Sequence, residues 1–286
     1  MSRSFTKSGL SIPSIGLGTW ELRGQECRRV VREALELGYR HIDTAAMYEN
    51  ESEVGVGLAE SGVDRNDVFL TTKINTIGWT ASQERKTVIK NEHIVDEFNQ
   101  SLSDLKTDYV DLLLIHWPTF STNLGDMLEI IYGIKENQKA KAIGVSNFNS
   151  TLLSECTRLG FDDIYCNQVE YHPFLSQEIL LKKMSEMDVI PVAYCPICRG
   201  DVAKDSVIIE LSEKYNKTPA QVTLRWVIQQ QSVAIPKSAK KRRLKENIDI
   251  YDFEIDDQDM DRIHSLARGQ RLVPNLDSNP LLGAWD

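Results

Sequence analysis

Four residues of this chain have side chains that together could transfer a proton to a carbonyl oxygen. They are Asp43, Tyr48, Lys73 and His116. A lysine ammonium close to the tyrosine is expected to lower its pKa from the reference value of about 10, because a positive charge favours the phenolate. The aspartate would hold the lysine, and the histidine would orient or stabilise the oxygen. Any one of these residues alone is more often part of a salt bridge or a solvated loop.

The histidine lies in the stretch Tyr109-Val-Asp-Leu-Leu-Leu-Ile-His-Trp-Pro118, directly after an unbroken apolar run. Residues 112–115 are all apolar, which is typical of a parallel strand buried on both faces. His116, Trp117 and Pro118 then indicate that the strand leaves the core and opens into a loop. In a βα barrel this end of a strand carries the chemistry. The alternative for a lone histidine here is that it caps a backbone group.

Apolar patterns predict the elements that must position these residues. Strands are expected over residues 15–19, 41–45, 68–72, 109–115, 142–145, 164–169, 189–194 and 233–235. Helices are expected over residues 27–37, 52–59, 94–105, 127–135, 152–159, 177–187, 207–215, 244–248 and 256–266, with another opening at Thr218-Pro219. Residues 5–12, interrupted by Ser8-Gly9, favour a hairpin. Residues 74–90 are expected to form a long loop.

Strands that alternate with helices predict a parallel sheet, and eight such units favour a closed barrel. The predicted fold is an α/β (βα)8 TIM barrel. We expect one domain over residues 1–286, with a short N-terminal β-hairpin and a C-terminal tail over the active-site mouth. In such a barrel the carboxyl ends of the strands share one rim, so the four polar residues can meet there. The G-x-G steps at Gly16 and Gly55 lack a third glycine in place, which weakens a Rossmann interpretation.

Composition excludes several classes of protein. The net charge of -9 and the pI near 5.2 argue against a nucleic-acid surface. The first residues lack the apolar segment of a signal peptide, and no apolar run reaches the roughly 20 residues that span a bilayer. Five unevenly spaced cysteines are typical of reduced thiols, so we expect a cytoplasmic protein. No apolar interface stripe stands out, and a monomer is expected.

The motifs, taken in order, resemble the aldo-keto reductase family along nearly the whole chain. They are Gly16-Leu-Gly-Thr-Trp20, Gly38-Tyr-Arg-His-Ile-Asp-Thr-Ala45 with Tyr48, Thr71-Thr-Lys73, Leu114-Ile-His-Trp-Pro118, Gly144-Val-Ser-Asn-Phe148, Asn167-Gln-Val-Glu-Tyr-His-Pro173, and Ile235-Pro-Lys-Ser238 followed by Arg243 and Glu246-Asn247. The compact loops and short tail look closest to bacterial 2,5-diketo-D-gluconate and methylglyoxal reductases.

The resemblance implies reduction of aldehydes or ketones by NADPH, with Asp43, Tyr48, Lys73 and His116 as the catalytic tetrad and Tyr48 as the acid. It implies a cofactor extended across the rim, held by Gly18, Thr19, Trp20, Asp43, Ser146, Asn147, Gln168, Tyr194, Cys195, Ile197, Lys237, Ser238, Arg243, Glu246 and Asn247. Of these, Ser146, Asn147 and Gln168 would hold the carboxamide, and Tyr194 would stack on the nicotinamide. Substrate would contact Trp20, Tyr48, His116 and Trp117. For the two tryptophans, ordinary packing is the alternative.

The segment from Lys237 to Lys245 holds six basic residues in nine. A nuclear-import patch or a solvated helix face is an alternative. Its place after the last strand favours an anion site at a helix N-terminus. Such a site suits the 2′-phosphate of NADPH, so we expect NADPH rather than NADH. The family resemblance implies that Lys237, Ser238 and Arg243 take this phosphate, with Glu246 and Asn247 near the adenine.

Cys195-Pro-Ile-Cys198 departs from the family pattern and puts the usual pyrophosphate contacts in doubt. A C-x-x-C can be redox active or half of a zinc site, but no second pair is present and the histidines show no metal spacing. We therefore expect incidental thiols and no metal. As a hypothesis, a disulfide here would hinder cofactor binding, which equal NADPH affinity of oxidised and reduced protein would contradict.

Two other functions remain open from the sequence. A barrel lyase could use Lys73 as a Schiff-base amine. A non-enzymatic protein could sense nicotinamide redox state on the same scaffold. For any of these functions, specificity is expected to lie in the loops at 74–90 and 118–125 and in the tail at 268–286.

Overall fold

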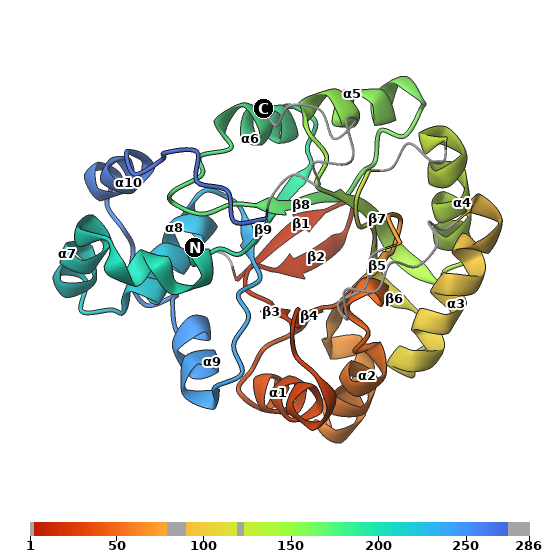
Figure 1. Ribbon diagram of the computed structural model, residues 1–286, viewed down its shortest axis with the longest axis horizontal. Helices are drawn as coiled ribbons and strands as arrows, with labels where there is room; N and C mark the ends of the chain where they lie inside the picture. Colours follow the sequence, from red (N-terminus) through yellow and green to blue (C-terminus); the bar gives the residue numbers. More distant parts are fainter. Residues whose placement is uncertain (1–2, 79–89, 119–122, 274–286) are drawn as a thin grey trace.

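The computed structural model describes residues 3–78, 90–118 and 123–273, and it shows the predicted parallel barrel. In sheet order its strands are β3 (Leu17–Gly18), β4 (His41–Asp43), β5 (Phe69–Ile74), β6 (Val110–Ile115), β7 (Ala140–Ser146), β8 (Cys166–Glu170), β9 (Ile190–Tyr194) and β10 (Val233–Ala234). A parallel bridge between Ile15 and Ala234 joins the two edges of the sheet and closes the ring (Figure 1). The assignment of all 286 residues to one domain stays a prediction.

Helices surround this ring in Figure 1. They are α1 (Gly24–Glu36), α2 (Glu51–Glu60), α3 (Ile94–Leu105), α4 (Leu124–Glu136), α5 (Ser150–Arg158), α6 (Glu178–Glu186), α7 (Ser206–Lys214), α8 (Pro219–Gln229), α9 (Lys241–Ile248) and α10 (Asp257–His264). The predicted cap at Thr218 is confirmed. The Thr218 hydroxyl oxygen accepts from the backbone N–H of Gln221, and the Gln221 side-chain oxygen accepts from the backbone N–H of Thr218. The turns at Cys198–Lys204 were not predicted, and Lys73 lies inside β5 rather than after it.

Side chains of the strands alternate between two apolar cores. One core fills the barrel and includes Leu112 and Leu114 of β6. The other lies between strands and helices and includes Leu113 and Ile115 of the same strand. Because successive residues of a strand point to opposite faces, a strand segment that contacts both cores is apolar at consecutive positions. This explains the continuous run before His116.

The N-terminal hairpin lies at one end of the barrel, and residues 268–273 lie at the other. The hairpin of β1 (Ser4–Lys7) and β2 (Leu10–Pro13) lies across the middle of the ring in Figure 1. Its Lys7 Nζ donates to the Ile164 carbonyl at 2.9 Å, just before β8 begins, so the hairpin closes the amino-terminal end. At the opposite end, residues 268–273 contact the chain that follows β8, as predicted for the tail. Residues 274–286, like 79–89 and 119–122 of the predicted loops, lie outside the described residues.

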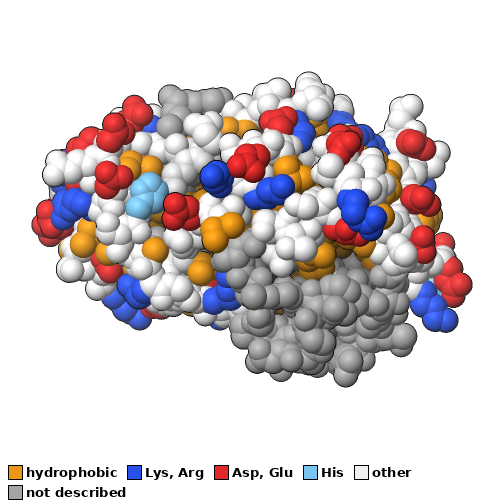
Figure 2. All heavy atoms as spheres, turned by 90° about the horizontal axis from the view of Figure 1, so that it is seen from above, with side chains coloured by type: hydrophobic (Ala, Val, Ile, Leu, Met, Phe, Trp, Pro, Cys, Tyr) orange, Lys and Arg blue, Asp and Glu red, His pale blue; other side chains and the backbone are white. Residues whose placement is uncertain are grey.

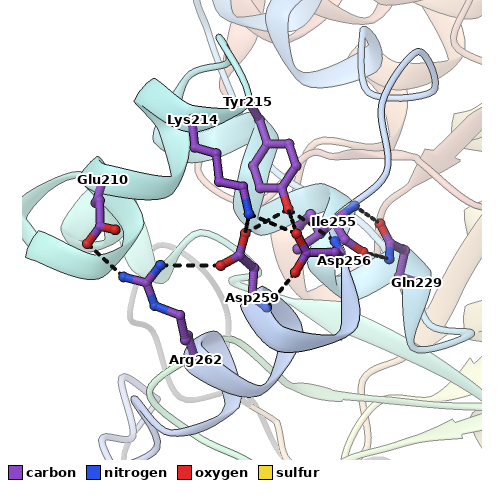
Figure 3. Close-up of polar contacts among 8 residues, drawn as sticks. All are labelled: Glu210, Lys214, Tyr215, Gln229, Ile255, Asp256, Asp259 and Arg262. Carbon is purple, nitrogen blue, oxygen red and sulfur yellow. Dashed lines mark hydrogen bonds and ion pairs between the residues drawn. The ribbon is translucent and has the colours of Figure 1, made fainter.

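A polar cluster fixes helix α10, from which the tail emerges. Figure 3 shows Lys214 and Tyr215, at the end of α7, pointing toward Asp256 and Asp259 at the start of α10. The Tyr215 hydroxyl donates to Asp259 at 2.7 Å, and the backbone N–H of Asp256 donates to the Tyr215 oxygen at 3.1 Å. The cluster therefore holds α10 against α7. Within the described residues, no helix is long and apolar enough to cross a membrane.

Candidate active site

Strand alternation brings three of the four chemical side chains to the inside of the barrel. Lys73 is four residues beyond Phe69 on β5, and Phe69 belongs to the inner core. His116 follows Leu114 by two positions and therefore also faces inward. Asp43 is the last residue of β4, and its side chain reaches Lys73. The predicted convergence at one rim is thus present in the structure.

The ammonium of Lys73 is surrounded by acceptors. Its Nζ donates to Asp43 Oδ1 at 2.6 Å, to the Thr44 carbonyl at 2.7 Å and to the Tyr48 hydroxyl oxygen at 3.2 Å. The side chain is 0% exposed. Burial lowers the pKa of Lys73, and the Asp43 carboxylate opposes that lowering because it stabilises the charged form. All three hydrogens of the ammonium are therefore used within the site.

Tyr48 ends a single 3-10 turn, η1 (Ala46–Tyr48), directly after β4. Arg23 donates a hydrogen bond to the carbonyl oxygen of Tyr48. The Tyr48 ring lies edge-on to Trp20, with 4.9 Å between ring centroids, and edge-on to His116, with 5.5 Å between centroids. The predicted lowering of its pKa is wrong. Burial, followed by the Asp43 charge, raises the pKa of Tyr48 well above the ordinary value, because both disfavour the phenolate. Tyr48 therefore stays protonated at neutral pH.

His116 is neutral in this environment. Burial, with a smaller contribution from Lys73, holds its pKa well below the ordinary value. Its buried Nδ1 has no hydrogen-bond partner among the described residues. A bare ring nitrogen is less costly to bury than an unpaired N–H, so we place the proton on Nε2. His116 can then donate a hydrogen bond from Nε2 without being charged.

A second set of polar side chains, at the ends of β7, β8 and β9, is hydrogen-bonded to the four residues described above. Gln168 Nε2 donates to Asp43 Oδ2 at 2.7 Å, and Ser146 Oγ donates to the Gln168 carbonyl at 2.8 Å. Asn147 donates to the His116 carbonyl and accepts from the Tyr194 hydroxyl at 2.9 Å. The residues predicted to hold a carboxamide are thus gathered beside the tetrad. They are already bonded to one another.

The predicted substrate residues have different environments. Trp20 is half-buried and lies against the Tyr48 ring. Trp117 is 6% exposed, and Thr76 binds both its N–H and its carbonyl oxygen. Its buried indole N–H has no hydrogen-bond partner among the described residues. The structure therefore places Trp20 next to the tyrosine and fixes Trp117 through its backbone.

The basic segment begins directly beyond β10, where the first and last strands meet. Gly18 N–H donates to the Pro236 carbonyl at 3.1 Å, so Pro236 adjoins β3 and the basic segment starts at the next residue. Ser238 is buried and accepts from the Lys240 N–H, whereas Lys237 and Arg243 are exposed. The predicted position at the N-terminus of a helix is confirmed by α9, which starts at Lys241.

Side chains elsewhere on the surface carry both charges. On the face shown in Figure 2, basic and acidic side chains are interspersed, with apolar side chains between them. Glu246 of α9 binds Arg242 at 3.1 Å, and Asn247 is buried. Arg242, next to the exposed Arg243 in the sequence, therefore already has a carboxylate partner in Glu246.

Residues 14–209 and 202–268 match the model of the aldo/keto reductase family. This chain belongs to that family. It is 39% identical over 271 residues to a glyoxal reductase of Bacillus subtilis, covering 94% of each chain. It is 38% identical over 275 residues to a 9,11-endoperoxide prostaglandin H2 reductase of Trypanosoma cruzi, covering 95% of this chain and 93% of the relative. These reductase relatives and the family match show that the protein is an oxidoreductase.

A solved structure gives the same result for the fold. The crystal structure of a putative 2,5-diketo-D-gluconic acid reductase B matches with a TM-score of 0.90 and 36% identity. The match covers 100% of this chain and 98% of that chain. The match supports the aldo/keto reductase barrel as the fold of this chain.

The C-x-x-C of this aldo/keto reductase forms a turn beside Tyr194. Cys198 N–H donates to the Cys195 carbonyl at 2.9 Å, and φ is 51° and 48° at the two cysteines. Both thiols are free. Burial raises their pKa values to about 11 and about 12, so little thiolate is present at neutral pH.

Sequence reasoning missed several residues that support the four predicted catalytic side chains. Asn50 donates to the Thr19 and Leu22 carbonyls and accepts from the Thr44 hydroxyl, which ties the loops after β3 and β4 together. Glu51 is buried and accepts from Thr72, the residue before Lys73. The only sequence signal was the position of Asn50-Glu51 directly after the tyrosine turn.

Proposed function

We propose that this protein reduces small aldehydes and ketones to alcohols with NADPH, through Asp43, Tyr48, Lys73 and His116. One observation carries the proposal. A protonated, buried Tyr48 accepts a hydrogen bond from Lys73, which is itself paired with Asp43. This is the arrangement that a general acid needs, because its own hydrogen is left to point at a substrate.

The residues around the tetrad fit a nicotinamide cofactor. Inward-facing amides and a hydroxyl at Ser146, Asn147 and Gln168 lie beside Tyr194, a flat ring that can stack on the nicotinamide. Toward the other end of the proposed groove, Lys237, Ser238 and Arg243 would bind the 2′-phosphate near the start of α9, with Glu246 and Asn247 at the adenine. Gly18, Thr19, Trp20, Cys195 and Ile197 would line the path between. When bound, NADPH supplies the hydride to the carbonyl carbon.

The chain's own residues handle the carbonyl oxygen. His116 would donate from Nε2 and hold the oxygen in place as negative charge develops. Tyr48 would then give its proton to that oxygen, while the Lys73 hydrogen bond stabilises the phenolate that remains. Asp43 keeps Lys73 charged and aimed, and Gln168 fixes the other oxygen of Asp43. Trp20 and Trp117 would provide the apolar sides of the substrate site.

The names of the relatives suggest the substrate class. One is a glyoxal reductase, and a structural neighbour is a putative diketo-gluconic acid reductase. We therefore propose small dicarbonyl compounds, such as ketoaldehydes and diketo sugar acids, as substrates. The monomeric state and the cytoplasmic location stay predictions.

The test is consumption of NADPH with a panel of ketoaldehydes, diketo sugar acids and aromatic aldehydes. Turnover that requires both carbonyl and NADPH is the expected result. A protein that binds NADPH but oxidises it with none of the panel would refute the proposal. Borohydride trapping of substrate on Lys73 would instead favour the lyase. The three acceptors that occupy the Lys73 ammonium weigh against it as a free nucleophile.

A further inference from the structure

Glu170 is a buried carboxylate at the rim of the barrel with no part in the proton transfer. It is the last residue of β8 and lies two positions beyond Gln168, on the same face of the strand. Glu170 and His172 are each 0% exposed, and His172 Nε2 lies 2.9 Å from a carboxylate oxygen of Glu170. A buried carboxylate requires hydrogen-bond partners. His172 is one partner of Glu170, and the C-terminal tail provides the others.

Two consecutive backbone N–H groups of the tail point at this carboxylate. Leu272 N–H donates to Glu170 Oε1 at 2.6 Å, and Val273 N–H donates to Oε2 at 2.9 Å. Burial by itself raises the pKa of Glu170. The hydrogen bonds from His172, Leu272 and Val273 outweigh burial and bring the pKa below the ordinary value. Glu170 is therefore ionised at neutral pH and binds the tail as a charge.

The preceding residues of the tail follow the same segment of the barrel. Arg268 N–H and Gln270 N–H both donate to the Phe174 carbonyl, at 3.2 and 3.0 Å. The guanidinium of Arg268 stacks on the Phe174 ring at 3.7 Å from its centroid, and Gln270 Nε2 donates to Cys198 Sγ at 3.5 Å. Residues 268–273 thus run from the turn after β9 to the end of β8.

This segment lies beside the reacting end of the barrel. Glu170 of β8 pairs with Tyr194 of β9 in the register of the sheet. The Tyr194 hydroxyl donates to Asn147 Oδ1 at 2.9 Å, and Asn147 donates to the His116 carbonyl. The tail residues that donate to Glu170 therefore lie at the rim of the barrel, next to the strand end that carries Tyr194.

We propose that Glu170, held by His172, is a positioning residue that fixes residues 268–273 as one wall of the carbonyl-substrate site and so determines which carbonyl compounds fit. The part concerning substrate rests on the proposed reductase function. The requirement is for a carboxylate, since a glutamine would present an NH2 group to one of the two backbone N–H donors. His172 donates from Nε2, and its Nδ1 has no partner among the described residues, which leaves Nδ1 as the bare nitrogen.

The test compares Glu170→Gln with the full-length parent by amide hydrogen exchange and steady-state kinetics. The exchange of the Leu272 and Val273 amides should become at least tenfold faster. KM for the carbonyl substrate should rise about tenfold, with kcat and NADPH affinity within about threefold of the parent. The matched control is Glu178→Gln, which makes the same change of charge at an exposed residue at the start of α6. It should leave both the amide exchange and KM unchanged.

A second variant, Val273→Pro, removes one tail donor and keeps the carboxylate. If Glu170 acts through the tail, the double variant should have a KM no higher than that of the worse single variant. Two results would overturn the proposal: a KM of the double variant that equals the product of the two single effects, or unchanged amide exchange of Leu272 and Val273 in Glu170→Gln.

If the parent consumes no NADPH with any carbonyl, the reductase function fails, and the exchange experiment still decides whether Glu170 holds the tail. If Glu170→Gln does not fold, faster Leu272 exchange in Val273→Pro supports the proposal and parent-like exchange overturns it.

Discussion

Lys73 donates a hydrogen bond to the hydroxyl oxygen of Tyr48 across 3.2 Å, from a position where nothing of the lysine is exposed. This contact occupies one lone pair of the phenol and leaves its hydrogen to point elsewhere. The same lysine is held by Asp43 and by the Thr44 carbonyl, so it has little freedom to move. In the proposed reaction, the direction of proton delivery would therefore be set before substrate arrives.

Tyr48→Phe removes the proposed proton donor and keeps the ring that packs against Trp20. We expect kcat to fall by about 10²- to 10⁴-fold, the usual contribution of a general acid. NADPH affinity, measured by fluorescence titration, should stay within about threefold, because the tyrosine oxygen is assigned to the carbonyl. Near-normal turnover would contradict the role of Tyr48.

The pH dependence of kcat for reduction follows from two pKa shifts. Burial raises the pKa of Tyr48, so its protonated, active form should persist into alkaline solution. Burial lowers the pKa of His116, so this residue should stay neutral across the range where imidazole ordinarily titrates. We expect a flat profile from about pH 6 to pH 9. A limb near pH 6.5 that disappears in His116→Gln would show that His116 titrates.

Glu51→Gln tests the buried carboxyl behind Lys73. Burial raises the pKa of Glu51 to about 7, against hydrogen bonds from Thr72 and Ser101. A folded-state pKa above the unfolded value means that the wild type loses stability as the pH rises toward and through about 7. The free energy of unfolding of Glu51→Gln should therefore improve relative to wild type by about 1 kcal/mol between pH 6 and pH 8. Urea denaturation of both proteins at pH 6 and pH 8 measures these free energies. If the difference between variant and wild type were the same at both pH values, the raised pKa of Glu51 would be contradicted.

Arg243→Ala tests the proposed phosphate site at the start of α9. The dissociation constant of NADPH should rise about 10- to 100-fold, because a charge-assisted contact to phosphate is lost, whereas that of NADH should change little. Arg242→Ala is the matched control, since Arg242 is equally basic but already binds Glu246. A similar loss for both variants, or for both cofactors, would place the 2′-phosphate elsewhere.

Tyr215→Phe tests the cluster that holds α10. The change removes the hydrogen bond to Asp259 and leaves the Asp256 N–H without its acceptor. We expect the free energy of unfolding to fall by about 1 kcal/mol, the usual value for one such contact. Chemical denaturation of the full chain measures this. No change would show that water replaces the hydroxyl without cost.

Local patterns in the sequence were enough to predict the barrel and the residues that meet at its rim. The apolar run at 112–115 and the regular alternation of strands and helices determine which elements form. The period of two along each strand then decides that Lys73 and His116 face the same interior. The family motifs pointed to the same residues, and the structure brings these together.

Only the tertiary structure decided the direction of the Tyr48 pKa shift and the contacts that hold the tail. The sequence suggested that Lys73 would lower the tyrosine pKa, but pKa depends on burial, and burial is produced by elements distant in the chain. Similarly, nothing local connects Glu170 with Val273, because their hydrogen bond links backbone and side chain across 103 positions. Periodicity records which face a residue takes, whereas solvation and long-range hydrogen bonding exist only once the chain has folded.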